Sequence, residues 1–175
     1  EKQGEEPIAR IASVKLSDTK YVYDKKAKKP TVTVTDANGK MLTYKSDYKL
    51  KYDSGRKKAG TYYVSVTFRG EYKGTKALKF KIVLPAATGL SAAGGKNTAT
   101  LNWKKTDGAG KYVVYMALAK NGTYKKVATT RKLTYTVKNL TPGATYYFRI
   151  RPMAVTASGS NTYGGYSKVK SAKIR

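Results

Sequence analysis

The sequence predicts an all-β protein made of two tandem β-sandwich domains. Apolar and polar residues alternate with a period of two along most of the 175 residues, and no stretch shows a convincing helical period. The alternation is interrupted at Leu84-Pro85-Ala86-Ala87, near the middle of the chain. Because small all-β domains close at roughly 80 to 100 residues, this length suits two such domains better than one.

The first half contains strands with one apolar and one polar face, as antiparallel sheets with one buried side require. Val32 and Val34 alternate with threonines, and Asp36-Ala37-Asn38-Gly39 then forms a turn signal that leads into a further strand-like stretch at residues 40–44. The other apolar faces of this half are Tyr48, Leu50 and Tyr52, then Tyr62, Val64, Val66 and Phe68, then Leu78, Phe80 and Ile82.

A second set of strands follows Pro85, which marks a strand boundary because proline cannot donate to a β-ladder. We therefore expect one domain over residues 8–84 and another over residues 85–175, joined by a short linker that limits bending. The apolar faces of the second set are Ala99, Leu101 and Trp103, then Tyr112, Val114 and Met116, then Tyr135 and Val137, then Tyr146, Phe148 and Ile150.

Several landmark sequences of the second half occur in a characteristic order. They are Leu101-Asn102-Trp103, a strand opened by Tyr112, the turn Leu140-Thr141-Pro142-Gly143-Ala144-Thr145-Tyr146, and Gly165-Tyr166-Ser167. This series resembles the fibronectin type III family and covers about residues 87–174. The resemblance implies that Tyr146 is buried with its hydroxyl bonded to nearby backbone. It also implies structural roles for Trp103, Tyr112, Leu140, Pro142 and Tyr146.

The first half carries a less specific series. Its members are Lys29-Pro30-Thr31-Val32-Thr33-Val34, Ser46-Asp47-Tyr48-Lys49-Leu50-Lys51-Tyr52, Ala59-Gly60-Thr61-Tyr62 and Tyr72-Lys73-Gly74-Thr75. These residues resemble the Ig-like repeats of cell-surface proteins from Firmicutes, which implies a bacterial, extracellular setting. Ser54-Gly55-Arg56 departs from the repeat pattern, so the loop there is expected to differ. Because the chain begins at Glu1 without a signal sequence, we expect a segment of a longer protein.

The charge balance is strongly basic, with 36 Lys and Arg against 10 Asp and Glu and a net charge of +26. Up to Leu84 there are 20 basic and 9 acidic residues, a balance of +11, and from Pro85 onward there are 16 basic residues and Asp107 alone, a balance of +15. Such a surface attracts polyanions, and salt weakens that attraction.

No candidate catalytic, cofactor-binding or metal site emerges from the sequence. The absence of Cys and His removes disulfides, thiol nucleophiles, imidazole bases and the common zinc sites. Asp47 and Asp53 lie about 20 Å apart if the segment is a strand, too far for a glycosidase pair. The turn at Asp36 begins like a calcium loop but lacks its later ligands. We therefore expect no enzymatic activity and no cofactor.

One polar strand face combines aromatic and basic residues. Tyr115, Tyr147, Arg149 and Arg151 are expected on the outer face of adjacent strands, with Lys125 and Lys126 nearby on the next strand. These six residues are our candidate binding site for a polyanion or glycan. The alternative interpretation is cross-strand pairing that stabilises an exposed sheet.

The sequence thus favours a non-catalytic pair of modules from a bacterial cell-surface protein, a monomer that acts as a spacer or adhesion segment. The expected partner is an anionic cell-wall polymer or glycan, or another surface protein. An alternative is the accessory region of a larger secreted wall hydrolase or peptidase. Nucleic-acid binding is less favoured because Lys outnumbers Arg 29 to 7 and Arg supplies bidentate base contacts. No apolar run approaches the roughly 18 residues that span a bilayer.

Overall fold

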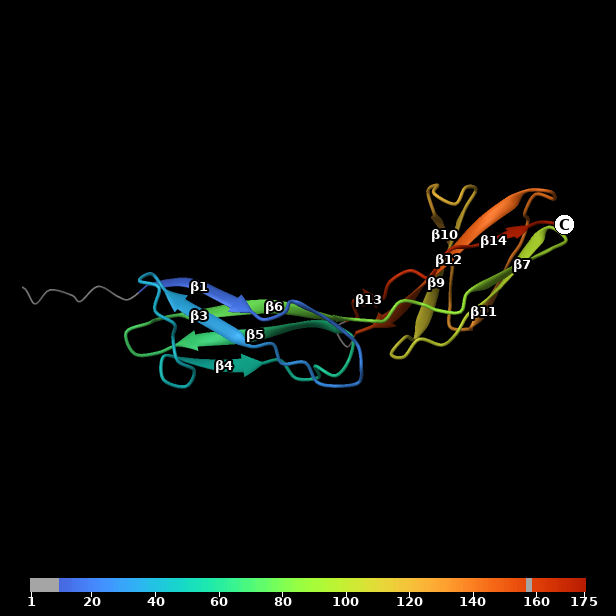
Figure 1. The fold of residues 1–175 in the computed structure, drawn as a ribbon. Helices are drawn as coiled ribbons and strands as arrows, with labels where there is room; N and C mark the ends of the chain where they lie inside the picture. Colours follow the sequence, from blue (N-terminus) through green and yellow to red (C-terminus); the bar gives the residue numbers. More distant parts are fainter. Residues whose placement is uncertain (1–9, 157–158) are drawn as a thin grey trace, which may run out of the picture. The chain divides into compact units, whose positions relative to one another are not determined.

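The computed structural model describes residues 10–156 and 159–175, and the regular elements in these ranges are all β-strands (Figure 1). The chain divides into two compact units. The first runs to Tyr21 and takes in Lys25–Lys57 and Thr61–Ile82, while the second takes in Val22–Asp24, Lys58–Gly60 and Val83–Arg175. The predicted all-β class with tandem β-sandwich domains is confirmed, and the boundary after residue 84 stays a prediction.

The first unit is built from two sheets. β1 (Ile11–Leu16) pairs antiparallel with β3 (Val32–Asp36), and the other sheet has the order β2 (Lys20–Val22), β6 (Thr75–Val83), β5 (Gly60–Phe68), β4 (Tyr48–Tyr52). The alternating apolar residues of β3, β4 and β5 form the core of this unit together with Val14, Leu42 and Tyr72. The period-two pattern of the sequence therefore corresponds to one buried face on each of these strands.

The expected strand at residues 40–44 does not form. Only isolated bridges occur there, between Thr35 and Met41 and between Tyr44 and Tyr48. The physical reason is the carboxylate of Asp36, whose Oδ1 accepts hydrogen bonds from the N–H groups of Asn38 (2.9 Å) and Lys40 (3.0 Å). These bonds hold a tight turn in place of a continuous hairpin, as short acidic side chains commonly do.

Asp36 is also part of a buried polar pair. Its side chain is only 5% exposed, and its Oδ2 accepts a hydrogen bond of 3.0 Å from the hydroxyl of Tyr72. Burial raises the pKa of the Asp36 carboxyl, but the backbone N–H of Lys40, the Tyr72 hydroxyl and the N–H of Asn38 together hold that pKa below its ordinary value. Burial, followed by the bond to Asp36, raises the pKa of Tyr72 to about 12.

This pair predicts a loss of stability in alkali. Because the pKa of Tyr72 is raised on folding, its contribution is fully present below the ordinary pKa near 10 and is lost as pH rises through about 12. The difference in melting temperature between the wild type and Tyr72→Phe should therefore shrink from pH 9 to pH 12. Thermal unfolding of both proteins across this range measures it, and the comparison cancels the titration of other tyrosines and lysines. A difference that stays constant with pH would contradict the prediction.

The second unit also contains two sheets. One has the order β11 (Thr134–Val137), β8 (Thr98–Asn102), β7 (Ser91–Gly95), and the other has the order β10 (Lys125–Thr130), β9 (Lys111–Ala117), β12 (Thr145–Val155), β13 (Asn161–Tyr163). β14 (Lys170–Lys173) pairs with the first part of β12, and β13 pairs with its last part. The long strand β12 therefore organises this sheet along its whole length.

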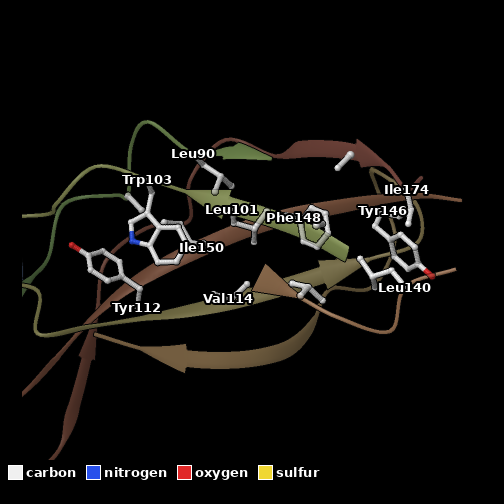
Figure 2. Close-up of a cluster of buried hydrophobic side chains, with 14 residues drawn as sticks. Leu90, Leu101, Trp103, Tyr112, Val114, Leu140, Tyr146, Phe148, Ile150 and Ile174 are labelled. Carbon is white, nitrogen blue, oxygen red and sulfur yellow. The ribbon is translucent and has the colours of Figure 1, made fainter. Parts of the chain in front are cut away.

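The core of the second unit lies between these sheets. Leu101, Val114, Phe148 and Ile150 each have no exposed surface, and Figure 2 shows them in a row between Trp103 at one end and Tyr146 at the other. Trp103 comes directly after β8 and packs on Tyr112, with the ring centroids 5.6 Å apart. Inward residues of β8, β9 and β12 thus occupy one continuous apolar layer.

A tyrosine closes the turn before β12. Tyr146 is 7% exposed, and its hydroxyl accepts a hydrogen bond of 3.2 Å from the backbone N–H of Thr141. The hydrogen bonds with Thr141 lower the pKa of Tyr146. Leu140 is buried beside it, and Pro142 is exposed in the turn. A similar bond occurs at the other end of the core, where the hydroxyl of Tyr112 accepts the N–H of Thr106 at 2.7 Å.

Candidate functional site

The candidate site lies on the outer face of the sheet that contains β9 and β12. Tyr146, Phe148 and Ile150 of β12 point into the core, so the alternation of the strand turns Arg149 and Arg151 outward. In the strand register Arg149 lies opposite Tyr115 of β9 and Arg151 lies opposite Val113. The sequence prediction therefore places Tyr115 and the two arginines on one face, as the structure does.

The two arginines are stacked with tyrosine rings in an alternating series, which we call the Tyr–Arg stack. It consists of Tyr124, Arg149, Tyr166, Arg151 and Tyr163. The guanidinium carbon of Arg149 lies 4.2 Å from the ring centroid of Tyr124 and 3.9 Å from that of Tyr166. The guanidinium carbon of Arg151 lies 5.0 Å from the centroid of Tyr166 and 4.7 Å from that of Tyr163. These distances are within the range of cation–π attraction.

The guanidinium groups differ in their hydrogen bonds. Arg151 donates from Nε to the carbonyl oxygen of Gly164 at 2.8 Å, which fixes its orientation. Arg149 has a buried Nε that lacks any hydrogen-bond partner within residues 10–156 and 159–175. A buried donor without a partner is costly, at about 1–3 kcal/mol. The Arg149 guanidinium is therefore held by its neighbouring rings and not by a hydrogen bond from Nε.

A glycine brings the tyrosines of the last loop over the arginines. Gly164 donates its N–H to the carbonyl of Pro152 at 3.0 Å, and a Cβ at this position would overlap the carbonyl oxygen of Pro85. Backbone therefore approaches so closely that a side chain cannot fit. Tyr163 precedes this contact and Tyr166 follows it, so Gly164 positions both rings of the stack.

Two tyrosines of this face, Tyr115 and Tyr124, have pKa values raised above the ordinary one. Burial raises the pKa of Tyr115, and its close neighbour Tyr166 raises it further. The two rings meet edge to face, with centroids 5.4 Å apart. Burial likewise raises the pKa of Tyr124, against the lowering effect of Arg149. The hydroxyls of Tyr115 and Tyr124 therefore do not neutralise the charge of Arg149.

The other predicted site residues are less closely associated. Lys126 lies opposite Tyr115 in the register and shares its face, whereas Lys125 lies opposite Met116 and belongs to the other side of the sheet. Tyr147 is half-buried opposite Ala117. No ring or cation–π contact joins it to the arginines in the described part of the chain. The structure therefore assembles three of the six candidates, Tyr115, Arg149 and Arg151, into one cluster.

Sequence reasoning missed three members of the Tyr–Arg stack, namely Tyr124, Tyr163 and Tyr166. Tyr124 lies before β10, Tyr163 ends the short strand β13, and Tyr166 lies in the segment before β14. Alternation cannot place residues outside long strands, because their direction depends on the path of the loop. The pair of arginines two residues apart on one strand face was the available signal, since such a face accommodates rings from neighbouring loops.

Other kinds of site receive no support from the described residues. Within residues 10–156 and 159–175 no group of three or more His, Cys, Asp or Glu residues could hold a metal ion. In the same ranges no helix is long and apolar enough to cross a membrane.

The comparisons with known proteins agree with the landmarks of the second unit. Residues 85–170 match the family profile described as fibronectin type III domain. Through these residues the chain belongs to the fibronectin type III family. Fibronectin type III domains are generally non-catalytic modules that are common in extracellular proteins, and they also occur as accessory regions of some enzymes. None of the curated proteins matches the chain.

Three solved structures are similar to parts of the chain. A Fn3-like protein from Clostridium thermocellum is 29% identical over 52% of this chain and 94% of its own, with a TM-score of 0.45. The protein FN3tt mut is 32% identical over 51% of this chain and 92% of its own, with a TM-score of 0.38. A β-1,2-glucanase from Parabacteroides distasonis is 17% identical over 63% of this chain and 17% of its own, with a TM-score of 0.41.

Proposed function

We propose that the chain is a non-catalytic spacer and adhesion segment of an extracellular bacterial surface protein, and that its fibronectin type III domain binds anionic polymers electrostatically. The observation that carries the proposal is the Tyr–Arg stack, which holds two permanent positive charges on one sheet face. Around it, the residues from Pro85 onward contribute 16 basic side chains and only one acidic one. A surface of this composition concentrates polyanions through its long-range field.

The stacking geometry favours an anion over a neutral sugar. The guanidinium carbons of Arg149 and Arg151 both lie within 5.0 Å of the ring centroid of Tyr166. The Tyr166 ring is therefore already engaged as a cation–π partner. An aromatic ring that holds cations offers less free face to an uncharged pyranose. The nitrogens at the edge of each guanidinium remain the groups that suit carboxylate, sulfate or phosphate oxygens, which they bind in charge-assisted hydrogen bonds.

The composition of the basic surface supports polymer binding without stereochemical precision. Most of the positive charges are lysines, which act as flexible point charges on any phosphate, sulfate or carboxylate. Wall polymers of the producing cell and acidic glycans of a host both have this chemistry. The proposal applies equally to a segment of an adhesin and to the accessory region of a larger wall hydrolase, because the binding chemistry belongs to this chain.

Titration with teichoic acid, heparin and single-stranded DNA at about 50 to 200 mM salt tests the proposal. Log affinity should fall linearly with log salt for all three polymers, because bound phosphates and sulfates release counterions. The double variant Arg149→Gln, Arg151→Gln should reduce the magnitude of the salt slope by about two, close to one per lost contact. Melting curves of the variant should show that the fold is retained.

A matched double variant serves as the control. Lys132 and Lys138 are exposed and flank β11 in the other sheet, so Lys132→Gln, Lys138→Gln removes the same charge away from the stack. This control should change the slope by less than about one. An equal effect of both variants would show that attraction is not focused at the stack. Tight, salt-independent binding of a neutral glycan would overturn the mechanism, and a strong preference for DNA would favour a nucleic-acid function.

A further inference from the structure

A second feature with binding character lies in the first unit, beside the edge strands β3 and β4. A groove of about 320 Å³ opens there. This volume is at the lower end of the range of small-ligand sites, about 300–1,000 Å³. The residues that line the groove are Lys29, Pro30, Thr31, Val32, Tyr44, Tyr48, Leu50 and Tyr52.

Side chains form hydrogen bonds to the backbone carbonyl groups along the β3 edge beneath the groove. The carbonyl oxygens of alternate residues along the segment that enters β3 each accept a side-chain hydrogen bond from the β4 side. Val32 accepts the Tyr48 hydroxyl at 3.3 Å, Pro30 accepts the Tyr52 hydroxyl at 2.7 Å, and Lys28 accepts Arg56 Nε at 2.9 Å. On β4, the carbonyl of Tyr48 accepts the N–H of Lys45 at 2.8 Å. These carbonyls are already engaged, which argues against an added peptide strand as the occupant.

The two ends of the groove differ in chemistry. One end is aromatic, because Tyr44 is 48% exposed and its ring lies 5.9 Å from that of the buried Tyr48. The other end is cationic, because Lys29 Nζ lies 5.5 Å and the Arg56 guanidinium carbon 5.2 Å from the ring centroid of Tyr52. Arg56 is held in place by its bond to Lys28 and by donation from Nη1 to the carbonyl of Asp53 at 2.8 Å.

Other charges near the groove leave the cationic end intact. Lys45 Nζ lies 6.0 Å from the ring centroid of Tyr44, at the outer limit of cation–π attraction and farther than the arginines lie from Tyr166, and it adds a positive charge at the aromatic end. The carboxylates of Asp47 and Asp53 each accept a backbone N–H, from Thr43 and Tyr63 respectively, at 2.7 Å. Lys29 and Arg56 therefore remain the charges best placed to meet an anionic group at the Tyr52 end.

We propose that this groove binds a uronic-acid unit of an acidic glycan. The apolar face of a pyranose ring packs on the exposed Tyr44, since aromatic side chains present large apolar surfaces with a polar rim. The carboxylate of the sugar lies toward Lys29 and Arg56 at the other end. This proposal rests on the proposed function only for its class of ligand, an anionic polymer. The groove lies in the first unit and shares no residue with the Tyr–Arg stack of the second unit.

Nuclear magnetic resonance titration of the full chain with digalacturonic acid tests the site. Within the first unit, amide shifts should be confined to residues 29–32 and 44–52, and the neutral disaccharide of the same linkage should bind at least about tenfold more weakly. Tyr44→Ala and Lys29→Gln should each weaken binding by about tenfold or more. Both side chains are exposed, so neither change disturbs the core.

Matched changes elsewhere in the same unit provide the controls. Tyr63 is 45% exposed on β5 and Lys79 is exposed on β6, so Tyr63→Ala and Lys79→Gln should leave the affinity unchanged. Shifts elsewhere in the first unit without shifts at the groove, or equal binding of the neutral disaccharide, would overturn the inference. The Arg149→Gln, Arg151→Gln variant separates the two proposals, because it should weaken polymer binding at the fibronectin type III domain and leave the disaccharide shifts of the first unit in place.

Discussion

Replacing Phe148 by alanine should destabilise the fibronectin type III domain by about 3–5 kcal/mol. Phe148 has no exposed surface, and Figure 2 shows its ring at the centre of the core between Leu101 and Ile150 on one side and Leu140 and Tyr146 on the other. Removing the ring leaves a cavity that the two facing sheets cannot fill. Because small domains are stable by only about 5–15 kcal/mol, the change removes a large part of the total.

The same variant tests whether the two units fold independently, with a boundary near Pro85. Calorimetry of the full chain should show two transitions. In Phe148→Ala only the transition of the fibronectin type III domain should move to a lower temperature than in the wild type. A wild-type fragment of residues 86–175 should melt cooperatively, at the temperature of the fibronectin type III transition in the wild-type full chain. Val155→Ala is the control on the same strand, because Val155 is 54% exposed and its truncation should stay within about 0.5 kcal/mol. Two transitions that shift together would refute independent folding.

The second large effect is expected from Gly164→Val. The added side chain overlaps the carbonyl oxygen of Pro85 and also approaches Pro152, so the backbone must move. Overpacking of this kind costs about 1–3 kcal/mol. Movement of residues 163–166 withdraws Tyr163 and Tyr166 from the two arginines, so affinity for anionic polymers should fall together with stability.

The side-chain Nε–H resonances of Arg149 and Arg151 report this change directly, because stacked rings shift them. Both resonances should move toward the positions of exposed arginines in Gly164→Val. Gly110→Val is the control in the same domain, since nothing lies within 4 Å of a Cβ at Gly110. Unchanged arginine resonances in the Gly164 variant would show that the Tyr–Arg stack does not depend on the close backbone contact.

Much of the fold follows from local patterns. Period-two alternation identifies the buried faces of β3, β5, β9 and β12, because side chains of a strand point to opposite sides of the sheet. The corner at Tyr146 follows from its turn sequence in the same way. Residues 40–44 show where local reasoning fails, because the carboxylate of Asp36 competes for the backbone N–H groups and interrupts the expected strand.

The sequence by itself determined the all-β class, the fibronectin type III landmarks, the charge and the outward face with Tyr115, Arg149 and Arg151. The class, the charge and the outward position of each residue depend on composition and on neighbours one or two residues apart, and the landmarks depend on their order along the chain. Only the tertiary structure decided which loop tyrosines cover the arginines. It also decided that Tyr48, Tyr52 and Arg56 donate hydrogen bonds to alternate backbone carbonyls at the β3 edge. Both arrangements join residues that are distant along the chain, and their geometry is set by how loops and sheet edges pack.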